Sequence, residues 1–155
     1  MAIVYFSLGT NLGDRHKNML TAVALLAERV GKILALSALY ETEPWGFDSD
    51  NPFLNVALSI ETALLPMELL RLTQQIEQEM GRTEKSNGSY HDRLIDIDLL
   101  MYDDLIINSP LLTLPHPLMH QRIFVLQPLA EIAPDLLHPL LNVTIAELYA
   151  QVSSK

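Results

Sequence analysis

The order of two helical segments among four short apolar runs is the feature that most constrains the fold. Apolar residues recur every three or four positions over residues 15–30 and 66–81, the spacing of an amphipathic helix, and Gly31 and Gly81 are placed to end these helices. The other runs are typical of strands and cover residues 2–8, 33–43, 53–61 and 94–102. This order predicts an α+β chain with a ferredoxin-like β-α-β-β-α-β sandwich, in which both helices pack on one face of an antiparallel sheet.

The segments after the fourth strand form a C-terminal extension. Asp103 begins a predicted turn, after which residues 105–107 are expected to pair back on the preceding strand. A short helix is expected at residues 122–132. Thr144 is followed three residues later by a glutamate, the spacing of a capping box, which predicts a final helix at residues 145–152.

Bulk composition limits the kinds of protein that this chain can be. Its 155 residues fit a single domain spanning residues 1–155, and a hydrophobic content of 49% supplies a sizeable core. The formal net charge of −9 disfavours a nucleic-acid partner, because the average field repels a polyanion. No apolar run reaches the ~20 residues of a membrane-spanning helix, and the chain has no cysteine. We therefore expect a cytoplasmic monomer with no membrane partner.

Two aspartates interrupt the fourth apolar run. Aspartate is a poor strand former, so Asp96 and Asp98 break the local rule, as functional residues often do. Residues two apart in a strand share a face and lie about 6.6 Å apart, while Ile95, Ile97 and Leu99 then point to the opposite, buried face. Carboxylates at this spacing suit one or two hard cations that also take phosphate oxygens. The alternative is a solvated polar face on an edge strand.

Three basic residues lie within one twelve-residue stretch just before these aspartates. Arg82, Lys85 and Arg93 could grip a polyphosphate, the arginines through a bidentate fork and the lysine as a point charge. The alternative is that they are ordinary surface bases, and without the aspartates nearby this alternative would be favoured.

The third strand carries residues suited to a flat ring. Phe53 and Asn55 share a face, and the amide of an asparagine presents donors and an acceptor in one plane, which suits the edge of a heterocycle. Phe53, together with Trp45 and Phe124, could sandwich such a ring. Taken alone, Phe53 and Asn55 favour the alternative of a core phenylalanine and a structural asparagine.

Two further pairs of residues have spacings that could serve a ligand. Gln74 and Glu77 lie three apart on the predicted second helix, so they share a face and could reach an adenosine sugar or an arginine, although a solvated helix face has the stronger prior. His116 and His120 lie four apart, but the prolines around His116 weaken a helix there, and we predict no zinc site.

The most specific pattern in the chain is Arg93-x-x-Asp96-x-Asp98, followed downstream by Pro115-His116 and Arg122-x-Phe124. Further segments of the same set cover residues 8–13, 40–46, 53–55, 74–77, 81–82 and 126–129. In this order and spacing the chain resembles the 6-hydroxymethyl-7,8-dihydropterin pyrophosphokinase family of folate biosynthesis, and the resemblance covers nearly its whole length.

The resemblance implies transfer of the β,γ-diphosphate of ATP to the hydroxymethyl group of 6-hydroxymethyl-7,8-dihydropterin, with release of AMP. It implies two Mg²⁺ ions on Asp96 and Asp98, and it makes Arg82 and Arg93 catalytic together with them. The residues that it assigns to the pterin are Thr42, Pro44, Trp45, Phe53, Asn55 and Phe124. Those that it assigns to ATP are Gln74, Glu77, Arg82, Lys85, Arg93, Ile97, Thr113, His116 and Arg122. Residues 44–52 and 82–92 are then expected to close over the ligands.

Two other functions compete with this interpretation. A non-catalytic ferredoxin-like ligand-binding or regulatory module would explain the fold, but not two strand aspartates beside three bases. A different nucleotidyl or phosphoryl transferase could share the acidic strand. The set of Phe53, Asn55 and Phe124 favours a flat heterocycle as the second substrate, and only the resemblance gives it a name.

Overall fold

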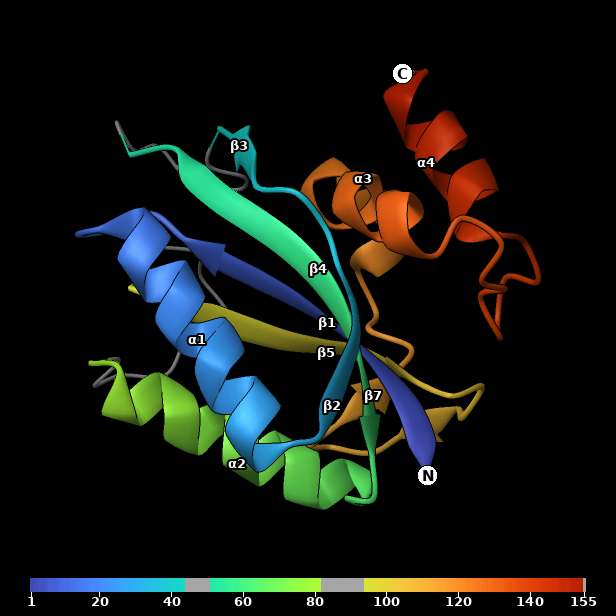
Figure 1. The fold of residues 1–155 in the computed structure, drawn as a ribbon. Helices are drawn as coiled ribbons and strands as arrows, with labels where there is room; N and C mark the ends of the chain where they lie inside the picture. The colour runs from blue at the N-terminus through green and yellow to red at the C-terminus, as the bar shows by residue number, and fades with distance from the viewer. Residues whose placement is uncertain (44–50, 82–93, 155) are drawn as a thin grey trace.

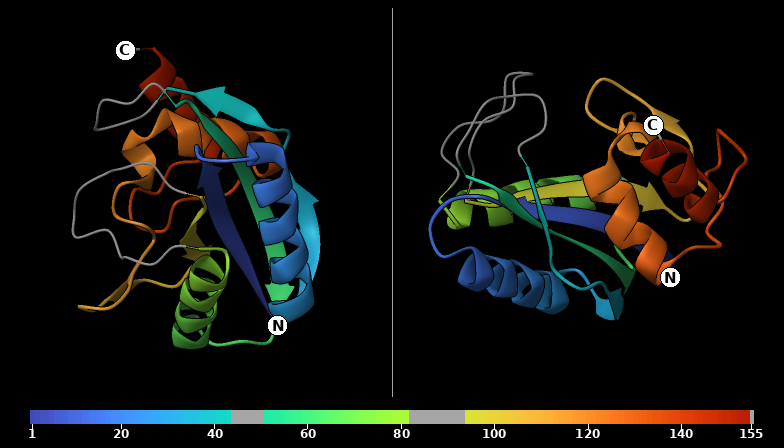
Figure 2. Two further views of the ribbon diagram at one scale, coloured as in Figure 1. Left: turned by 90° about the vertical axis from the view of Figure 1, so that its left-hand side faces the viewer. Right: turned by 90° about the horizontal axis from the view of Figure 1, so that it is seen from above.

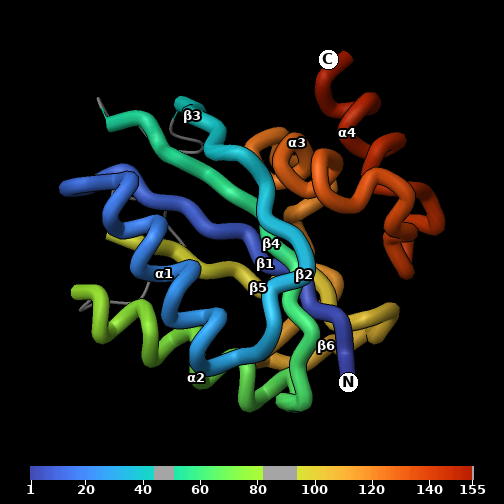
Figure 3. The backbone as a smooth tube through the Cα atoms, viewed as in Figure 1, coloured from blue at the N-terminus to red at the C-terminus, as the bar shows by residue number. Residues whose placement is uncertain are grey.

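The protein is built on an antiparallel sheet. The computed structural model describes residues 1–43, 51–81 and 94–154. The strands are β1 (Ala2–Thr10), β2 (Lys32–Leu36), β3 (Tyr40–Thr42), β4 (Phe53–Thr62) and β5 (Asp96–Tyr102). They lie in the order β2-β4-β1-β5, and β3 also pairs with β4. Every one of these pairings is antiparallel. Figure 3 traces the chain from β2 into β3 alongside β4.

Helices cover both faces of this sheet. The helices are α1 (Arg15–Arg29), α2 (Pro66–Glu79), the 3-10 turn η1 (Met119–Gln121), α3 (Ile123–Ile132) and α4 (Ile145–Ser153). One core cluster joins α1 and α2 to one face of the sheet, through residues such as Phe6, Leu26 and Ile76. A second cluster joins α3 and α4 to the other face, through Ala57 and Leu129 among others. Figures 1 and 2 show the sheet between these two layers.

Local sequence signals start the helices where they were expected. The Asp14 carboxylate accepts from the Lys17 N–H at 3.1 Å and caps α1. The predicted capping box at Thr144 is present at the start of α4. No helix in the described ranges is long and apolar enough to cross a membrane. The predicted α+β chain with helices on an antiparallel sheet is confirmed, while the name ferredoxin-like for its topology stays a prediction.

Two expectations about chain turns need correction. Residues 105–107 do not pair back on β5: Ile107 belongs to β6 (Ile107–Asn108), which pairs with β7 (Thr113–Leu114). The cause is a local turn, in which the Ser109 hydroxyl exchanges hydrogen bonds with the backbone of Leu112. Residues 33–43 likewise form two short strands, not one.

Gly31 follows α1 for a reason other than the one expected. Its φ angle is not positive, so it does not supply a left-handed cap. A Cβ atom at this position would lie 2.0 Å from the Glu61 carbonyl oxygen, so the close approach of the neighbouring strand requires glycine.

Candidate active site

Three strands bring polar residues into register on the face of the sheet that α3 covers. Gly9 of β1 pairs with Asn55 of β4 on one side and with Asp96 of β5 on the other. One step along, Ser7 pairs with Ala57 and with Asp98. Neighbouring strands lie about 4.8 Å apart, so the Asn55 and Asp96 backbones are separated by roughly 10 Å across Gly9. We call the surface formed by Asn55, Gly9, Asp96, Ser7 and Asp98 the site floor.

The two aspartates share one face of β5, as predicted. Asp96 and Asp98 are half-buried, whereas Ile95, Ile97 and Leu99 between and beside them are buried in the core. Among the described residues no three His, Cys, Asp or Glu side chains form a metal cluster. A pair of carboxylates nevertheless fits magnesium, which is commonly held by one or two carboxylates together with substrate phosphates and water.

Glu77 reaches the acidic strand from α2, on the opposite layer. Its carboxylate, in a residue only 8% exposed, accepts from the Ile97 N–H at 2.8 Å. Since β5 is the last strand in the order, this bond satisfies a backbone donor on its outer edge, at the residue between Asp96 and Asp98. The structure thus brings together Glu77 and Ile97, both predicted for ATP, through a contact that the sequence did not suggest.

A hydrogen bond fixes the amide of Asn55. Its Nδ2 donates to the Thr42 Oγ1 at 2.5 Å, which leaves the Oδ1 as the acceptor that this amide can offer elsewhere. A Cβ added to Gly9 would lie 3.2 Å from the Asn55 Oδ1 and 3.4 Å from the Phe53 ring. Glycine at position 9 therefore lets the side chains of Asn55 and Phe53 pack closely against the β1 backbone. A glycine inside a strand is a signal of such close approach and could have been used at the sequence level.

The N-cap residue of α3 supplies a buried cation beside an aromatic ring. Arg122 is 5% exposed, and its guanidinium carbon lies 5.6 Å from the centre of the Phe124 ring. Burial lowers the pKa of Arg122 to about 10, so the side chain still carries its charge at pH 7. Phe124 packs at the edge of the second core cluster, on the sheet face to which Phe53 and Asn55 also point.

Glu131 ties α3 to the segment that leads into β3. Its carboxylate accepts from the Tyr40 hydroxyl at 2.5 Å and from the Ala38 N–H at 3.1 Å. The hydrogen bond to Glu131, with burial as a second cause, raises the pKa of Tyr40 to about 12. Glu131 was not predicted from the sequence, because its contact with Tyr40 joins residues 91 positions apart and follows no local pattern.

His116 lies close enough to β5 for the charge of Asp96 to affect its pKa. The backbone N–H of His116 donates to the Leu100 carbonyl at 2.9 Å. The ring Nδ1 accepts from the Leu118 N–H at 3.2 Å, so the neutral ring carries its proton on Nε2. Burial lowers the pKa of His116, while the charge of Asp96 raises it. Thr113 in β7 and Gln74 in α2 are half-buried. His120 instead neighbours His138, with ring centres 6.2 Å apart.

Five of the predicted site residues lie outside the described ranges. They are Pro44, Trp45, Arg82, Lys85 and Arg93. Their roles, and the expected closure of residues 44–52 and 82–92 over the ligands, stay predictions.

Comparisons with known proteins place the chain in a family. Residues 5–134 match the model of 7,8-dihydro-6-hydroxymethylpterin-pyrophosphokinase (HPPK). The chain is 55% identical over 141 residues to the 2-amino-4-hydroxy-6-hydroxymethyldihydropteridine pyrophosphokinase of Porphyromonas gingivalis, covering 90% of this chain and 95% of the relative. It is 42% identical over 147 residues to the Aquifex aeolicus protein of the same name, covering 95% and 90%.

A solved structure supports the fold. HPPK-DHPS of Plasmodium falciparum superposes with a TM-score of 0.81 at 19% identity, over 99% of this chain and 44% of that longer chain. The family match and the bacterial relatives at 55% and 42% identity make this α+β protein a pyrophosphokinase. The chain belongs to the 7,8-dihydro-6-hydroxymethylpterin-pyrophosphokinase family.

Proposed function

We propose that this protein transfers the β,γ-diphosphate of ATP to the hydroxymethyl group of 6-hydroxymethyl-7,8-dihydropterin, in a Mg²⁺-dependent step of folate biosynthesis. The names of its relatives in P. gingivalis and A. aeolicus support the pterin acceptor. The single observation that carries the chemistry is the register of the site floor, which sets the heterocycle-reading Asn55 and the acidic pair on the same face of three adjacent strands.

The reaction forms one bond and breaks another at the same phosphorus. The hydroxymethyl oxygen bonds to the β-phosphorus, the bond from that phosphorus to the AMP oxygen breaks, and the hydroxyl proton is lost. Two Mg²⁺ ions on Asp96 and Asp98 would supply charge neutralisation on the phosphates and Lewis-acid activation of the hydroxyl. The protein's own task is then to align the two substrates, which can account for much of the rate enhancement.

Each predicted site residue that the structure describes would have a part in that alignment. Asn55 would read the pterin edge through its Oδ1, with Phe53 and Phe124 against the ring faces. Arg122 would bind phosphate oxygens through its guanidinium, which stays charged at pH 7. His116 would donate from Nε2, and Gln74, Glu77, Ile97 and Thr113 would surround the nucleotide. The monomeric state and the cytoplasmic location stay predictions.

An omission experiment tests the proposal. The purified protein is incubated with ATP, Mg²⁺ and 6-hydroxymethyl-7,8-dihydropterin, and AMP is quantified by chromatography. AMP is expected only when all three are present, together with a pterin product that has gained two phosphates. Formation of ADP, or AMP release that does not depend on the pterin, would contradict the proposal.

A further inference from the structure

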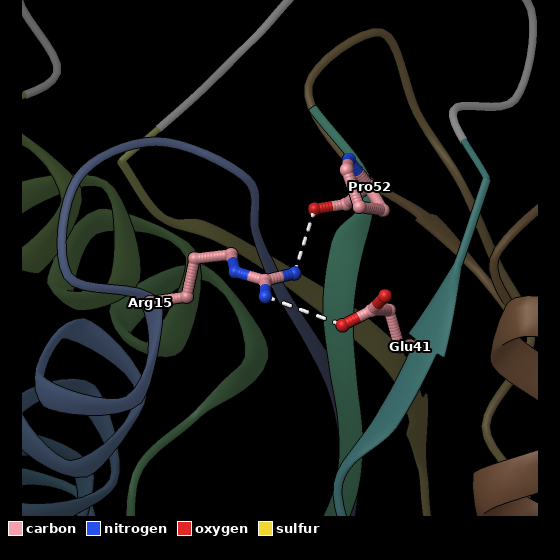
Figure 4. A network of polar contacts seen from close by, with 3 residues as sticks. All are labelled: Arg15, Glu41 and Pro52. Atoms are coloured by element: carbon pink, nitrogen blue, oxygen red, sulfur yellow. Dashed lines mark hydrogen bonds and ion pairs between the residues drawn. The ribbon is translucent and has the colours of Figure 1, made fainter. Parts of the chain in front are cut away.

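Arg15, in the first turn of α1, contacts β3 and the residue just before β4, next to residues proposed for the pterin. Its Nη1 donates to the Pro52 carbonyl at 3.0 Å, and its Nη2 donates to the Glu41 carboxylate at 3.2 Å. Figure 4 shows the guanidinium reaching from α1 to the Pro52 carbonyl and to the Glu41 carboxylate. Within residues 1–43, 51–81 and 94–154, the two hydrogen bonds of this guanidinium go to residues that are not assigned to a substrate.

The position of these contacts matters because β3 is only three residues long. Its ladder with β4 has the pairs Tyr40–Asn55, Glu41–Leu54 and Thr42–Phe53. The final pair consists of two residues proposed for the pterin, and Glu41 and Pro52 immediately precede its two members. Arg15 thus bridges the two strands next to the pair that shapes the pterin site.

A second bond from the same turn follows the same pattern. The Asn11 Nδ2 donates to the Asn51 carbonyl at 3.1 Å, and Asn11 is 3% exposed. Residues of this turn, Arg15 included, line a surface pocket together with Asn51 and Pro52. The segment from Asn11 to Arg15 therefore contacts residues 51 and 52 just before β4, and Arg15 also pairs with Glu41 of β3.

Other side chains hold both ends of this short ladder. Tyr40 is held by Glu131 of α3, and Thr42 accepts from Asn55. Without Arg15, the ladder would keep these bonds but lose the bridge next to its Thr42–Phe53 pair. The loss would displace Thr42 relative to Phe53 without unfolding the sheet, because an ion pair this exposed contributes little to global stability.

We propose that Arg15 is a positioning residue for the pterin: by joining Glu41 to the Pro52 carbonyl it sets the separation of Thr42 and Phe53, and so the affinity for the pterin. This inference rests on the proposed function. It assigns Arg15 no contact with the nucleotide or with the reacting atoms. The expected signature is accordingly a defect in pterin binding with ATP binding intact.

The test compares Arg15→Gln, Arg15→Lys and Glu41→Gln with wild type. KM is measured for each substrate, and the pterin Kd is measured with Mg²⁺ and α,β-methylene-ATP, whose α,β bridge resists cleavage. Arg29→Gln is the matched control, because Arg29 lies on the same helix and pairs with Glu79 of α2, and neither residue is assigned to a substrate. It removes an equally exposed Arg–Glu pair.

For Arg15→Gln the pterin KM and Kd should rise by roughly 10-fold or more, since small misplacements near a reacting group have large effects. The ATP KM and the melting temperature should match those of Arg29→Gln. Arg15→Lys and Glu41→Gln should fall between, because each keeps part of the bridge, and Glu41→Gln remains informative should Arg15→Gln fold poorly.

The failure of this inference is distinguishable from the failure of the proposed function. If wild type forms AMP but Arg15→Gln and Glu41→Gln keep the wild-type pterin KM and Kd, the positioning role is wrong and the function stands. An equal rise in Arg29→Gln would also overturn the role. If wild type forms no pterin-dependent AMP, the proposed function fails, and this inference fails with it.

Discussion

Asn55 and Asp96 are both register partners of Gly9, one from each neighbouring strand, so a residue suited to a heterocycle edge and a residue suited to a metal face the same surface roughly 10 Å apart. That separation leaves room for one small bicyclic ring with a short substituent between them. The absence of a side chain on Gly9 keeps the space over the central strand clear.

Gly9→Ala should weaken pterin binding without destabilising the protein. The added methyl group would lie 3.2 Å from the Asn55 Oδ1 and 3.4 Å from the Phe53 ring, so both side chains must shift by a few tenths of an ångström. We expect a higher pterin KM, an unchanged ATP KM and an unchanged or higher melting temperature, because alanine is favoured over glycine in a strand. An unaltered pterin KM in steady-state assays would show that the floor is not a binding surface.

The amide of Asn55 should contribute more to pterin affinity than the Thr42 hydroxyl that orients it. Asn55→Leu removes the donor and the acceptor at similar volume, and a ligand polar group left unsatisfied costs about 1–3 kcal/mol, or roughly 5- to 150-fold in Kd. Thr42→Val removes only the Oγ1 that orients the amide, so we expect a smaller loss. Equilibrium binding of the pterin measures both. Equal losses, or none, would contradict this division of roles.

Glu77 allows its structural and nucleotide-binding roles to be separated. Glu77→Leu leaves the buried Ile97 N–H without its acceptor and should lower the free energy of unfolding by about 1–3 kcal/mol. Glu77→Gln keeps an oxygen acceptor and should be more stable than the leucine variant. If Glu77 also binds ATP, the glutamine variant will raise the ATP KM despite its stability. Denaturant unfolding and substrate titration of the same two proteins distinguish these outcomes.

His138 should make the C-terminal region sensitive to acid. Its Nδ1 accepts from the N–H groups of Leu140 and Leu141, and burial, with nearby His120 as a second cause, lowers the pKa of His138. The unfolded chain therefore binds a proton first: the contribution to stability is complete above the unfolded pKa of about 6.5 and is lost as pH falls through the folded pKa.

His138→Asn tests this pH dependence, because asparagine keeps a side-chain acceptor that does not titrate. The free energy of unfolding, measured in urea between pH 7.5 and 5, should fall more steeply for wild type than for the variant. Parallel curves would show that protonation of His138 is not linked to folding.

Short-range sequence patterns predicted the helices and strands, but they did not predict the contacts between residues far apart in the sequence. The alternation of Asp96 and Asp98 with buried isoleucines follows from the two-residue period of a strand, so it was readable in the sequence. The bond from Glu77 to Ile97 depends on α2 lying along the outer edge of β5, and the bridge from Arg15 depends on β3 and β4 meeting beside α1. Neither follows from residue type or spacing. The roles of the site residues in catalysis stay predictions.

The most direct test of the account is the rate of AMP formation by Asp96→Asn and Asp98→Asn. Asparagine keeps the shape of the side chain but removes the charge that would hold Mg²⁺. With ATP, Mg²⁺ and 6-hydroxymethyl-7,8-dihydropterin present, we expect kcat to fall by at least about 10²-fold in each variant. Asp104→Asn, in the exposed turn after β5, should keep the wild-type rate. Wild-type rates in the first two variants would contradict the claim that this strand is the catalytic centre.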